Sequence, residues 1–260
     1  MEKNNERVAI ITGSANGIGK SIAKKFIQQN IKVILVDIDQ INLNKTVLEI
    51  DPLMESTESV IADVSSEKDL EIVKSIVQDK FGYLDILINN AGIAPNRLLE
   101  DQKLDEWEKV IKVNLTGTFL CSKMAVGIMK ERKEKRKYIL NMTSVSGTVG
   151  SVGRSAYGVS KAGIIQLTKQ MAVEFAEYNI LVNSISPGPV NTNLTKNSDE
   201  ATKNYISRIP LKKFTEKQSI ATAAAFLTSE DCDFITGHTL NIDGGFLAGG
   251  INFSKADLRE

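Results

Sequence analysis

Residues 8–26 read VAIITGSANGIGKSIAKKF, a stretch that joins an apolar run, closely spaced glycines and the start of an amphipathic segment. The run Val8–Thr12 is rich in β-branched residues, which favours a buried strand. The following segment, Ile18–Gln29, has apolar residues at helical spacing. The stretch therefore predicts a strand, a glycine turn and a helix.

The glycines of this turn are suited to a dinucleotide. Glycine permits a tight turn and lets backbone N–H groups approach a pyrophosphate at the amino end of the helix, where the helix dipole favours negative charge. The alternative for glycines this close together is a flexible turn with no ligand. The residues predicted to bind cofactor here are Gly13, Asn16, Gly17, Ile18 and Gly19.

The same alternation of strand and helix continues along the chain. Further β-rich runs are Lys32–Asp37, Ser59–Ala62, Ile86–Asn89, Tyr138–Met142, Leu181–Ile185 and Thr239–Ile242. Further helix-like stretches are Glu67–Lys80, Asp105–Lys130, Tyr157–Tyr178 and Glu216–Thr228, with Ser66 and Thr215 as expected N-caps. We predict an α/β fold in which residues 1–260 form one domain, a Rossmann-like, doubly wound parallel sheet of about seven strands with helices on both faces.

An acidic residue ends the second predicted strand. A carboxylate at Asp37 can accept hydrogen bonds from the adenosine ribose hydroxyls, and it would repel a 2′-phosphate. No basic residue lies at Ser14, Ala15 or Asn16 to counter that repulsion. We therefore expect NAD(H) rather than NADP(H), with Asp37 and Ile38 at the adenosine; the alternative for Asp37 is a solvated strand end.

A candidate catalytic set of three residues follows the fifth predicted strand. Tyr157 and Lys161 lie four apart on a predicted helix, so they face the same way, and Ser144 lies upstream. Positive charge from Lys161 and from an oxidised nicotinamide would stabilise the phenolate of Tyr157, which makes it usable as a base. Ser144 can donate a hydrogen bond to the substrate oxygen. The alternative for the Tyr157 and Lys161 pair is a surface helix pair, and no metal is expected.

The chain resembles the short-chain dehydrogenase/reductase family over nearly its whole length. Thr12–Gly19 match the family's TGxxxGxG signature, Asn89–Gly92 match NNAG, and Pro187–Thr192 match PGxVxT. The resemblance implies an NAD(P)-dependent oxidoreductase and adds Asn114, in a KVNLTG-like stretch, to the catalytic set. It assigns Asn114 to holding a water that links Lys161 to solvent, through a local distortion of its helix. Further cofactor contacts that it implies are Asp63, Val64, Asn90, Ala91, Gly92, Tyr157, Lys161, Pro187, Gly188, Val190 and Thr192.

Some of these residues have structural alternatives. Asp63 is also a common turn former, and the amides of Asn89 and Asn90 can satisfy backbone groups at strand ends. Asn114 is a mediocre helix former whose ordinary place would be a solvent-facing position. The only histidine, His238, is assigned to structure because no nucleophile pattern accompanies it.

Composition narrows the partners. The 32 basic residues balance 32 acidic ones, so we expect a small-molecule substrate and neither nucleic acid nor membrane. The charge run 130–137, KERKEKRK, is interpreted as a solvated helix end or turn, with a docking patch as the alternative. Cys121 and Cys232 are interpreted as buried thiols, and with no apolar signal segment at the N-terminus they indicate a cytoplasmic protein.

The substrate is the least determined feature. Segments 93–98, 145–154 and 191–214 should overhang the carboxyl ends of the strands, and we expect a substrate-binding lid at about 188–215 and a C-terminal tail at about 246–260. Polar residues in the lid favour a sugar, polyol or other hydroxylated metabolite, interconverted between secondary alcohol and carbonyl. The alternatives are a 3-oxoacyl-[acyl-carrier-protein] reductase-like enzyme that uses NADPH and, in another class, a catalytically silent dinucleotide-binding scaffold. Resemblance to the family also implies a homotetramer.

Overall fold

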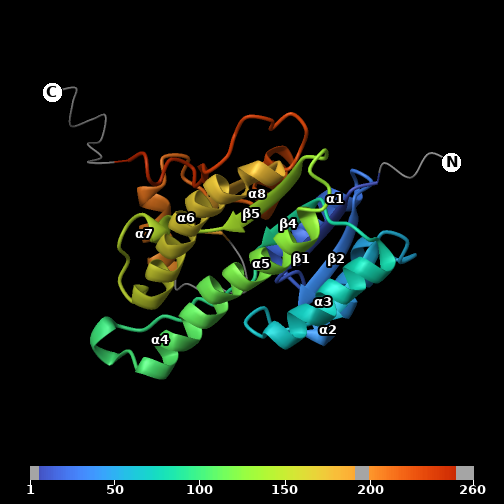
Figure 1. The fold of residues 1–260 in the computed structure, drawn as a ribbon. Helices are drawn as coiled ribbons and strands as arrows, with labels where there is room; N and C mark the ends of the chain where they lie inside the picture. The colour runs from blue at the N-terminus through green and yellow to red at the C-terminus, as the bar shows by residue number, and fades with distance from the viewer. Residues whose placement is uncertain (1–5, 191–198, 250–260) are drawn as a thin grey trace.

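The computed structural model describes residues 6–190 and 199–249 and contains one parallel sheet (Figure 1). Its strand order is β3-β2-β1-β4-β5-β6-β7, which confirms the predicted doubly wound α/β fold. Because the chain crosses from the β3 edge back to the middle, β1 and β4 flank the point where ligands bind in such sheets. The strands are β1 Val8–Thr12, β2 Lys32–Asp37, β3 Thr57–Ile61, β4 Ile86–Asn89, β5 Lys137–Met142, β6 Ile180–Pro187 and β7 Thr239–Ile242.

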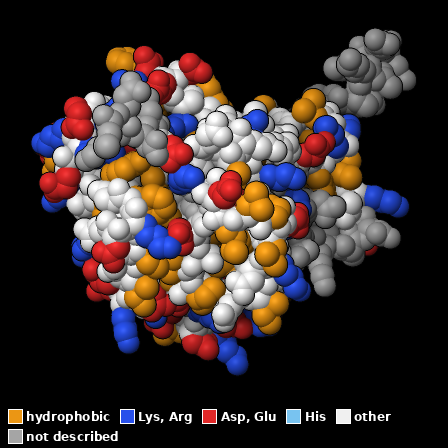
Figure 2. All heavy atoms as spheres, turned by 90° about the vertical axis from the view of Figure 1, so that its right-hand side faces the viewer, with side chains coloured by type: hydrophobic (Ala, Val, Ile, Leu, Met, Phe, Trp, Pro, Cys, Tyr) orange, Lys and Arg blue, Asp and Glu red, His pale blue; other side chains and the backbone are white. Residues whose placement is uncertain are grey.

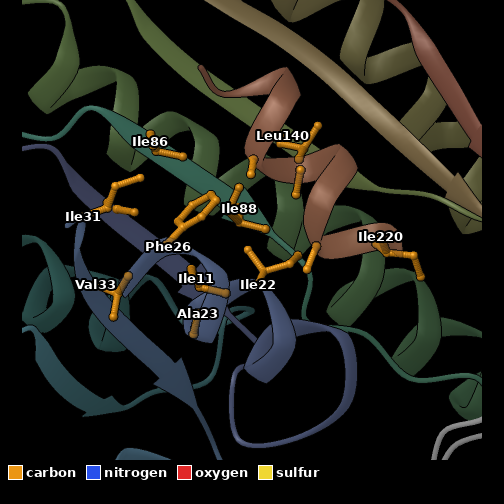
Figure 3. Packing of buried hydrophobic residues seen from close by; sticks show 14 of the residues in the cluster. Ile11, Ile22, Ala23, Phe26, Ile31, Val33, Ile86, Ile88, Leu140 and Ile220 are labelled. Carbon is orange, nitrogen blue, oxygen red and sulfur yellow. The ribbon is translucent and has the colours of Figure 1, made fainter. Parts of the chain in front are cut away.

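Helices cover both faces of the sheet, as predicted. One core cluster packs α1, α2 and α8 on one face, and a second packs α3, α5 and α6 on the other. Figure 3 shows Phe26 of α1 among Ile11, Ile31 and Ile88, side chains that are entirely or almost entirely buried. The helices are α1 Gly17–Ile27, α2 Gln40–Ile50, α3 Glu67–Lys80, α4 Leu104–Ile111, α5 Gly117–Met129, α6 Ser155–Phe175, α7 Asp199–Arg208 and α8 Lys217–Leu227.

The structure corrects the sequence analysis in three places. Helix α7 lies where no helix was predicted, and α2 is the helix expected after Lys32–Asp37, for which no bounds were predicted. The predicted helix Asp105–Lys130 is divided into α4 and α5 by a π-helical turn, Lys112–Thr116. Glu216, not Thr215, is the N-cap of α8, because the Thr215 N–H and hydroxyl donate to the carbonyls of Pro189 and Ile242 and tie the chain to β7. Ser66 is confirmed as the N-cap of α3, since its hydroxyl accepts from the Asp69 N–H.

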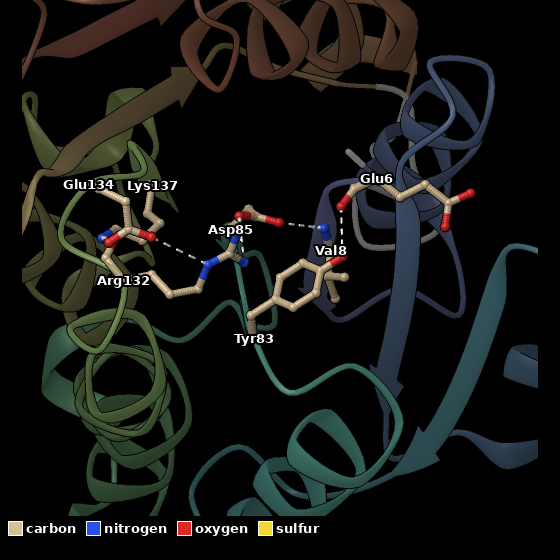
Figure 4. A network of polar contacts seen from close by, with 7 residues as sticks. All are labelled: Glu6, Val8, Tyr83, Asp85, Arg132, Glu134 and Lys137. Carbon is tan, nitrogen blue, oxygen red and sulfur yellow. Dashed lines mark hydrogen bonds and ion pairs between the residues drawn. The ribbon is translucent and has the colours of Figure 1, made fainter. Parts of the chain in front are cut away.

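The charge run 130–137 is a turn, but it is not solvated throughout. The Arg132 guanidinium stacks 4.3 Å from the centroid of the Tyr83 ring and lies 3.9 Å from the Asp85 carboxylate (Figure 4). Asp85 also accepts from the Val8 N–H at 2.8 Å, and Lys137, 1% exposed, donates to the Arg132 carbonyl. The run therefore covers the amino ends of β1, β4 and β5, at the edge of the sheet opposite the glycine turn.

The surface carries mixed charge. On the face in Figure 2, basic, acidic and hydrophobic side chains are interspersed, without a continuous band of one sign. In the described part of the chain, no helix is long and apolar enough to cross a membrane. Both cysteines, Cys121 and Cys232, are buried free thiols, as the sequence predicted.

Candidate active site

The glycine turn between β1 and α1 has the geometry that its residues predict. Gly13 has φ +64°, and a Cβ there would lie 2.7 Å from the Ala91 Cα, so no larger residue fits. A Cβ on Gly19 would collide with the carbonyl of Gly13. Gly17, with φ +62°, has open space within 4 Å of its Cβ position. Two glycines thus serve close packing, and Gly17 leaves room above the turn for a ligand.

The amino end of α1 is free to bind an anion. The N-cap, Asn16, makes no side-chain capping bond, and the first turn contains no acidic residue. The N–H groups of the first helical turn, which includes Gly17 and Ile18, therefore keep the unpaired donors that a phosphate can use. This end of the helix fits the pyrophosphate of a dinucleotide.

Asp37 lies beside this turn at the end of β2. One oxygen of its carboxylate accepts from the Ala15 N–H at 2.9 Å and the other from the Asp39 N–H at 3.0 Å. A carboxylate oxygen can accept more than one hydrogen bond, so capacity for ribose hydroxyls remains. The neighbouring Ile38 is 69% exposed, which suits an apolar contact with an adenine ring.

Asp63 and Val64, after β3, have structural partners already. The Asp63 carboxylate accepts from the N–H and the hydroxyl of Ser65, both at 2.8 Å, which is the turn-forming role considered as its alternative. Val64 is 7% exposed and packs against Gly117 of α5, where a Cβ would lie 2.8 Å from its methyl carbon. Their contact with the cofactor stays a prediction.

The residues after β4 hold the glycine turn in place. The Asn90 amide donates to the carbonyls of Thr12, at 2.9 Å, and Gly13, at 2.8 Å. The Thr12 hydroxyl accepts in return from the N–H groups of Asn90 and Ala91. Asn90 therefore satisfies backbone groups at a strand end, as its structural alternative stated, and it fixes the ends of β1 and β4 together.

Ser144 and Tyr157 meet at the carboxyl end of β5. Ser144 follows the strand, Tyr157 lies in the first turn of α6, and their hydroxyls are hydrogen-bonded. Burial raises the pKa of the Tyr157 phenol, while the bond with Ser144 and the positive charge of Arg154 act to lower it. In the cofactor-free protein the phenol is therefore protonated at neutral pH and can act as a proton donor.

Lys161 is buried behind the phenol. Its ammonium donates to the Met142 carbonyl at 2.8 Å and lies 5.7 Å from the centroid of the Tyr157 ring. Burial lowers the pKa of Lys161 to about 8. From the sequence we expect Lys161 to stabilise a phenolate. In the structure the cation that lowers the pKa of Tyr157 is Arg154, and the effect of Lys161 stays a prediction for the cofactor-bound protein.

Asn114 lies in the π-helical turn, fully buried, so the expected helix distortion is present and the solvent-facing alternative is wrong. Its amide oxygen accepts from the Ile93 N–H at 2.8 Å, and its nitrogen donates to the Ile93 carbonyl and to the Ser160 hydroxyl, both at 3.0 Å. A Cβ on Gly92 would lie 3.1 Å from the Asn114 amide oxygen and 3.6 Å from the Lys161 nitrogen. Asn114, Gly92 and Lys161 thus form one cluster.

Sequence reasoning missed Ser160, Ser122 and Asn141, which support this cluster together with Asn89. Ser160 bridges Asn114 to the active-site helix, since its hydroxyl donates to the Tyr157 carbonyl at 2.7 Å. Below it, the Asn89 amide donates to Asn141 and Ser122, which joins β4 to β5 and α5. The strand register places Asn89 opposite Asn141. Polar side chains inside otherwise apolar strands were the available signal for these contacts.

The segment after β6 reaches the same edge of the sheet. The Gly188 N–H donates to the Ile242 carbonyl at 3.0 Å, and a Cβ on Gly188 would lie 2.8 Å from the Asp243 Cα. Pro187 and Val190 are buried on either side of this close approach. Thr192, the last predicted cofactor contact, lies outside the described residues.

His238 is remote from this chemistry. Its N–H donates to the Asn183 amide oxygen and its carbonyl accepts from the Ser184 N–H, so its backbone joins the start of β7 to β6. The structural assignment made from the sequence agrees with these contacts.

Comparison with known proteins places the chain among relatives of similar length. A family model described as enoyl-(acyl carrier protein) reductase matches residues 13–247. The 3-oxoacyl-[acyl-carrier-protein] reductase FabG of Thermotoga maritima is 38% identical, over 93% of this chain and 98% of the relative. Glucose 1-dehydrogenase 2 of Bacillus subtilis is 35% identical, over 92% of this chain and 94% of the relative.

A solved structure agrees with these relatives. The 3-ketoacyl-(acyl-carrier-protein) reductase from Brucella melitensis, crystallised with NADH, superposes with a TM-score of 0.87 at 30% identity. The superposition covers 92% of this chain and 98% of that one. The matched length, the shared fold and the assembled Ser144, Tyr157 and Lys161 agree, and the chain belongs to the short-chain dehydrogenase/reductase family.

Proposed function

We propose that this enzyme reduces the 3-oxo group of a 3-oxoacyl thioester to a 3-hydroxyacyl thioester with NADH. The family membership makes the chain an NAD(P)-dependent oxidoreductase that acts on CH–OH groups. The observation that carries the proposal is the Tyr157 phenol, bonded to Ser144, with the buried Lys161 behind it. Ketoacyl reductases among the relatives and solved structures favour the thioester over the sugar or polyol first expected.

In the proposed reaction, NADH held by the glycine turn and Asp37 would supply a hydride to the carbonyl carbon. The Ser144 hydroxyl donates a hydrogen bond to the carbonyl oxygen and stabilises the negative charge that develops there. The Tyr157 hydroxyl gives its proton to the same oxygen, which yields the alcohol. The Lys161 ammonium stabilises the resulting phenolate, and the cluster with Asn114 lies where a water can return a proton from solvent.

The preference for NADH over NADPH rests on Asp37. Its carboxylate is fixed beside the glycine turn by two backbone N–H groups, and the Asp39 carboxylate caps α2 close by. A 2′-phosphate would place two more negative charges beside them. The thioester reductase considered from the sequence uses NADPH, whereas the enzyme proposed here uses NADH. The cofactor and the substrate therefore need separate tests.

The substrate would enter over the carboxyl ends of the strands. We assign contacts with it to the lid at 188–215, part of which, residues 191–198, lies outside the described residues. Within the lid, the Tyr205 ring of α7 packs edge-on against the Phe214 ring, with centroids 6.4 Å apart. Single-domain organisation, cytoplasmic location and a role for the 246–260 tail stay predictions.

A second candidate is the sugar or polyol dehydrogenase, favoured by the likeness to glucose 1-dehydrogenase 2. The same catalytic groups would then run the reaction towards oxidation, with Tyr157 as the base. A catalytically silent scaffold is not favoured, because Asn114, Ser144, Tyr157 and Lys161 are all present and brought together.

The test is a steady-state assay of the purified protein with both cofactors. We expect turnover of an acetoacetyl thioester with NADH, and a kcat/KM for NADH at least about tenfold above that for NADPH. Asp37→Ser should reduce that preference, while Asp79→Ser, which removes a carboxylate from the surface of α3, should not. Oxidation of glucose or polyols with no thioester reduction would contradict the proposed substrate, and preference for NADPH would contradict the role of Asp37.

A further inference from the structure

Arg154 is fixed beside the catalytic tyrosine but belongs to none of the predicted site motifs. It is the N-cap residue of α6, and its guanidinium carbon lies 5.5 Å from the centroid of the Tyr157 ring. One guanidinium nitrogen donates to the Ala94 carbonyl at 2.9 Å, in the loop after β4. The Arg97 N–H also donates to the Gly153 carbonyl, which ties the same two segments together.

Among the side chains that the structure describes, no acidic group pairs with Arg154. Arg97, on the neighbouring loop, pairs instead with Glu106 at 2.8 Å. A guanidinium carries five N–H donors, and the hydrogen bonds within the described chain account for one of them. Donors on a half-buried cation therefore remain for an oxygen of a ligand.

We propose that Arg154 is a substrate-binding residue that selects 3-oxoacyl compounds by donating to the acyl oxygen two carbons from the reacting carbonyl. The inference rests on the proposed function, because that function puts the reacting oxygen between Ser144 and Tyr157. An acyl oxygen so close to the reacting carbon falls in the neighbourhood of a guanidinium anchored beside the phenol. A thioester oxygen and a free carboxylate share this chemistry, and the planar guanidinium fits the carboxylate with two parallel bonds.

Arg154 also acts on the pKa of Tyr157, and kinetics can distinguish this second effect from substrate binding. Its positive charge lowers the pKa of the phenol, so its removal raises that pKa for every substrate alike. A binding role instead raises KM only for substrates that carry the second oxygen. The comparison between substrates, rather than the loss of rate alone, isolates the binding role.

The experiment compares wild type, Arg154→Gln and Arg154→Lys with the control Arg136→Gln, an exposed arginine at the opposite edge of the sheet. The substrates are an uncharged acetoacetyl thioester of N-acetylcysteamine, acetoacetate, and 2-pentanone, which lacks the second oxygen. For Arg154→Gln we expect KM for the substrate that wild type uses, thioester or acid, to rise roughly 10- to 100-fold, with little change in KM for 2-pentanone. Arg154→Lys should recover part of the loss, and Arg136→Gln should leave all KM values unchanged.

The outcomes separate the two proposals. Equal losses of kcat/KM on 2-pentanone and on the second-oxygen substrate would overturn the binding role of Arg154 while leaving the proposed function intact. Failure of the wild type to reduce either the thioester or acetoacetate would overturn both. Use of acetoacetate alone would keep the role of Arg154 and replace the thioester by the free acid. NADH binding by each variant, measured by fluorescence titration, confirms that the variant is folded.

Discussion

At the residue scale, the two reacting groups have pKa values displaced in opposite directions by the same cause. Burial raises the pKa of Tyr157 and lowers the pKa of Lys161 to about 8, since a low-dielectric site disfavours both charged forms. The proposed chemistry needs the phenolate and the ammonium together. Each then stabilises the other, and the positive charge of an oxidised nicotinamide adds to the stabilisation of the phenolate.

The burial of Lys161 predicts a pH dependence of stability. Between pH 8 and 10.5 the unfolded chain keeps a proton on Lys161 that the folded chain has released, so the free energy of unfolding rises with pH there. Relative to Lys161→Met, the wild type should gain about 3 kcal/mol across this range. Urea unfolding of the cofactor-free protein at several pH values measures it. Lys169→Met, an exposed position on α6, is the control, and parallel pH curves for wild type and Lys161→Met would contradict the prediction.

Sequence patterns predicted the types of residue at the site better than their bonds. The spacing of Tyr157 and Lys161 was readable because helical periodicity is local. Ser160 and Arg154 were not readable, because their roles depend on contacts with Asn114 and Ala94 that only the folded chain creates. The predicted effect of Lys161 on Tyr157 depends in the same way on a cofactor that no sequence pattern positions.

At the element scale, the strands were predicted closely, helix α7 was missed, and α2 was expected after β2 without bounds. Strands buried on both faces are continuous runs of apolar residues, a strong signal. Helix α2 contains Asn42, Asn44 and Thr46, which are weak helix formers, and it is held by burial of Leu43 and Val47 against α1 and the sheet. Tertiary packing of that kind overrides local propensity and is invisible in a single window of sequence.

Close contact between two elements also positions Ser144. The short 3₁₀ turn Val145–Gly147 packs on α6, and a Cβ on Gly147 would lie 2.8 Å from the backbone carbon of Lys161. Gly147→Ala must therefore push the turn away from α6. We expect a Tm several degrees lower and kcat reduced about tenfold or more, measured by thermal unfolding and steady-state kinetics.

Gly150 is the matched control for Gly147. A Cβ on Gly150 has nothing within 4 Å, so Gly150→Ala should change neither Tm nor kcat. A Gly147→Ala enzyme as stable and active as Gly150→Ala would show that this contact does not position Ser144.

At the scale of the whole molecule, the sheet order follows from the alternation of strands and helices. Parallel strands joined by right-handed crossovers leave few topologies, so the doubly wound sheet was predictable without its exact register. The buried network around Asp85 and Arg132 was not, because a run of mixed charge usually lies in solvent.

Assembly is a prediction at this scale. Apolar side chains remain exposed along the outer sides of α5 and α6, among them Phe119 at 46%, Val159 at 50% and Val173 at 79%. We expect a homotetramer to cover these side chains, since symmetric oligomers bury apolar surface at their interfaces. Light scattering should give four times the 28.5 kDa chain mass. Val173→Glu should lower that mass, whereas Gln170→Glu on the same helix should not; a wild-type mass of one chain would contradict the assembly.

The most direct test of the central claim is the turnover rate of Tyr157→Phe, which removes one hydroxyl and keeps the ring. Reduction of an acetoacetyl thioester, followed by the loss of NADH absorbance, should fall by at least about 10²-fold in kcat, while NADH binding and thermal stability stay near those of the wild type. An unchanged kcat in the folded variant would mean that the Tyr157 phenol does not deliver the proton.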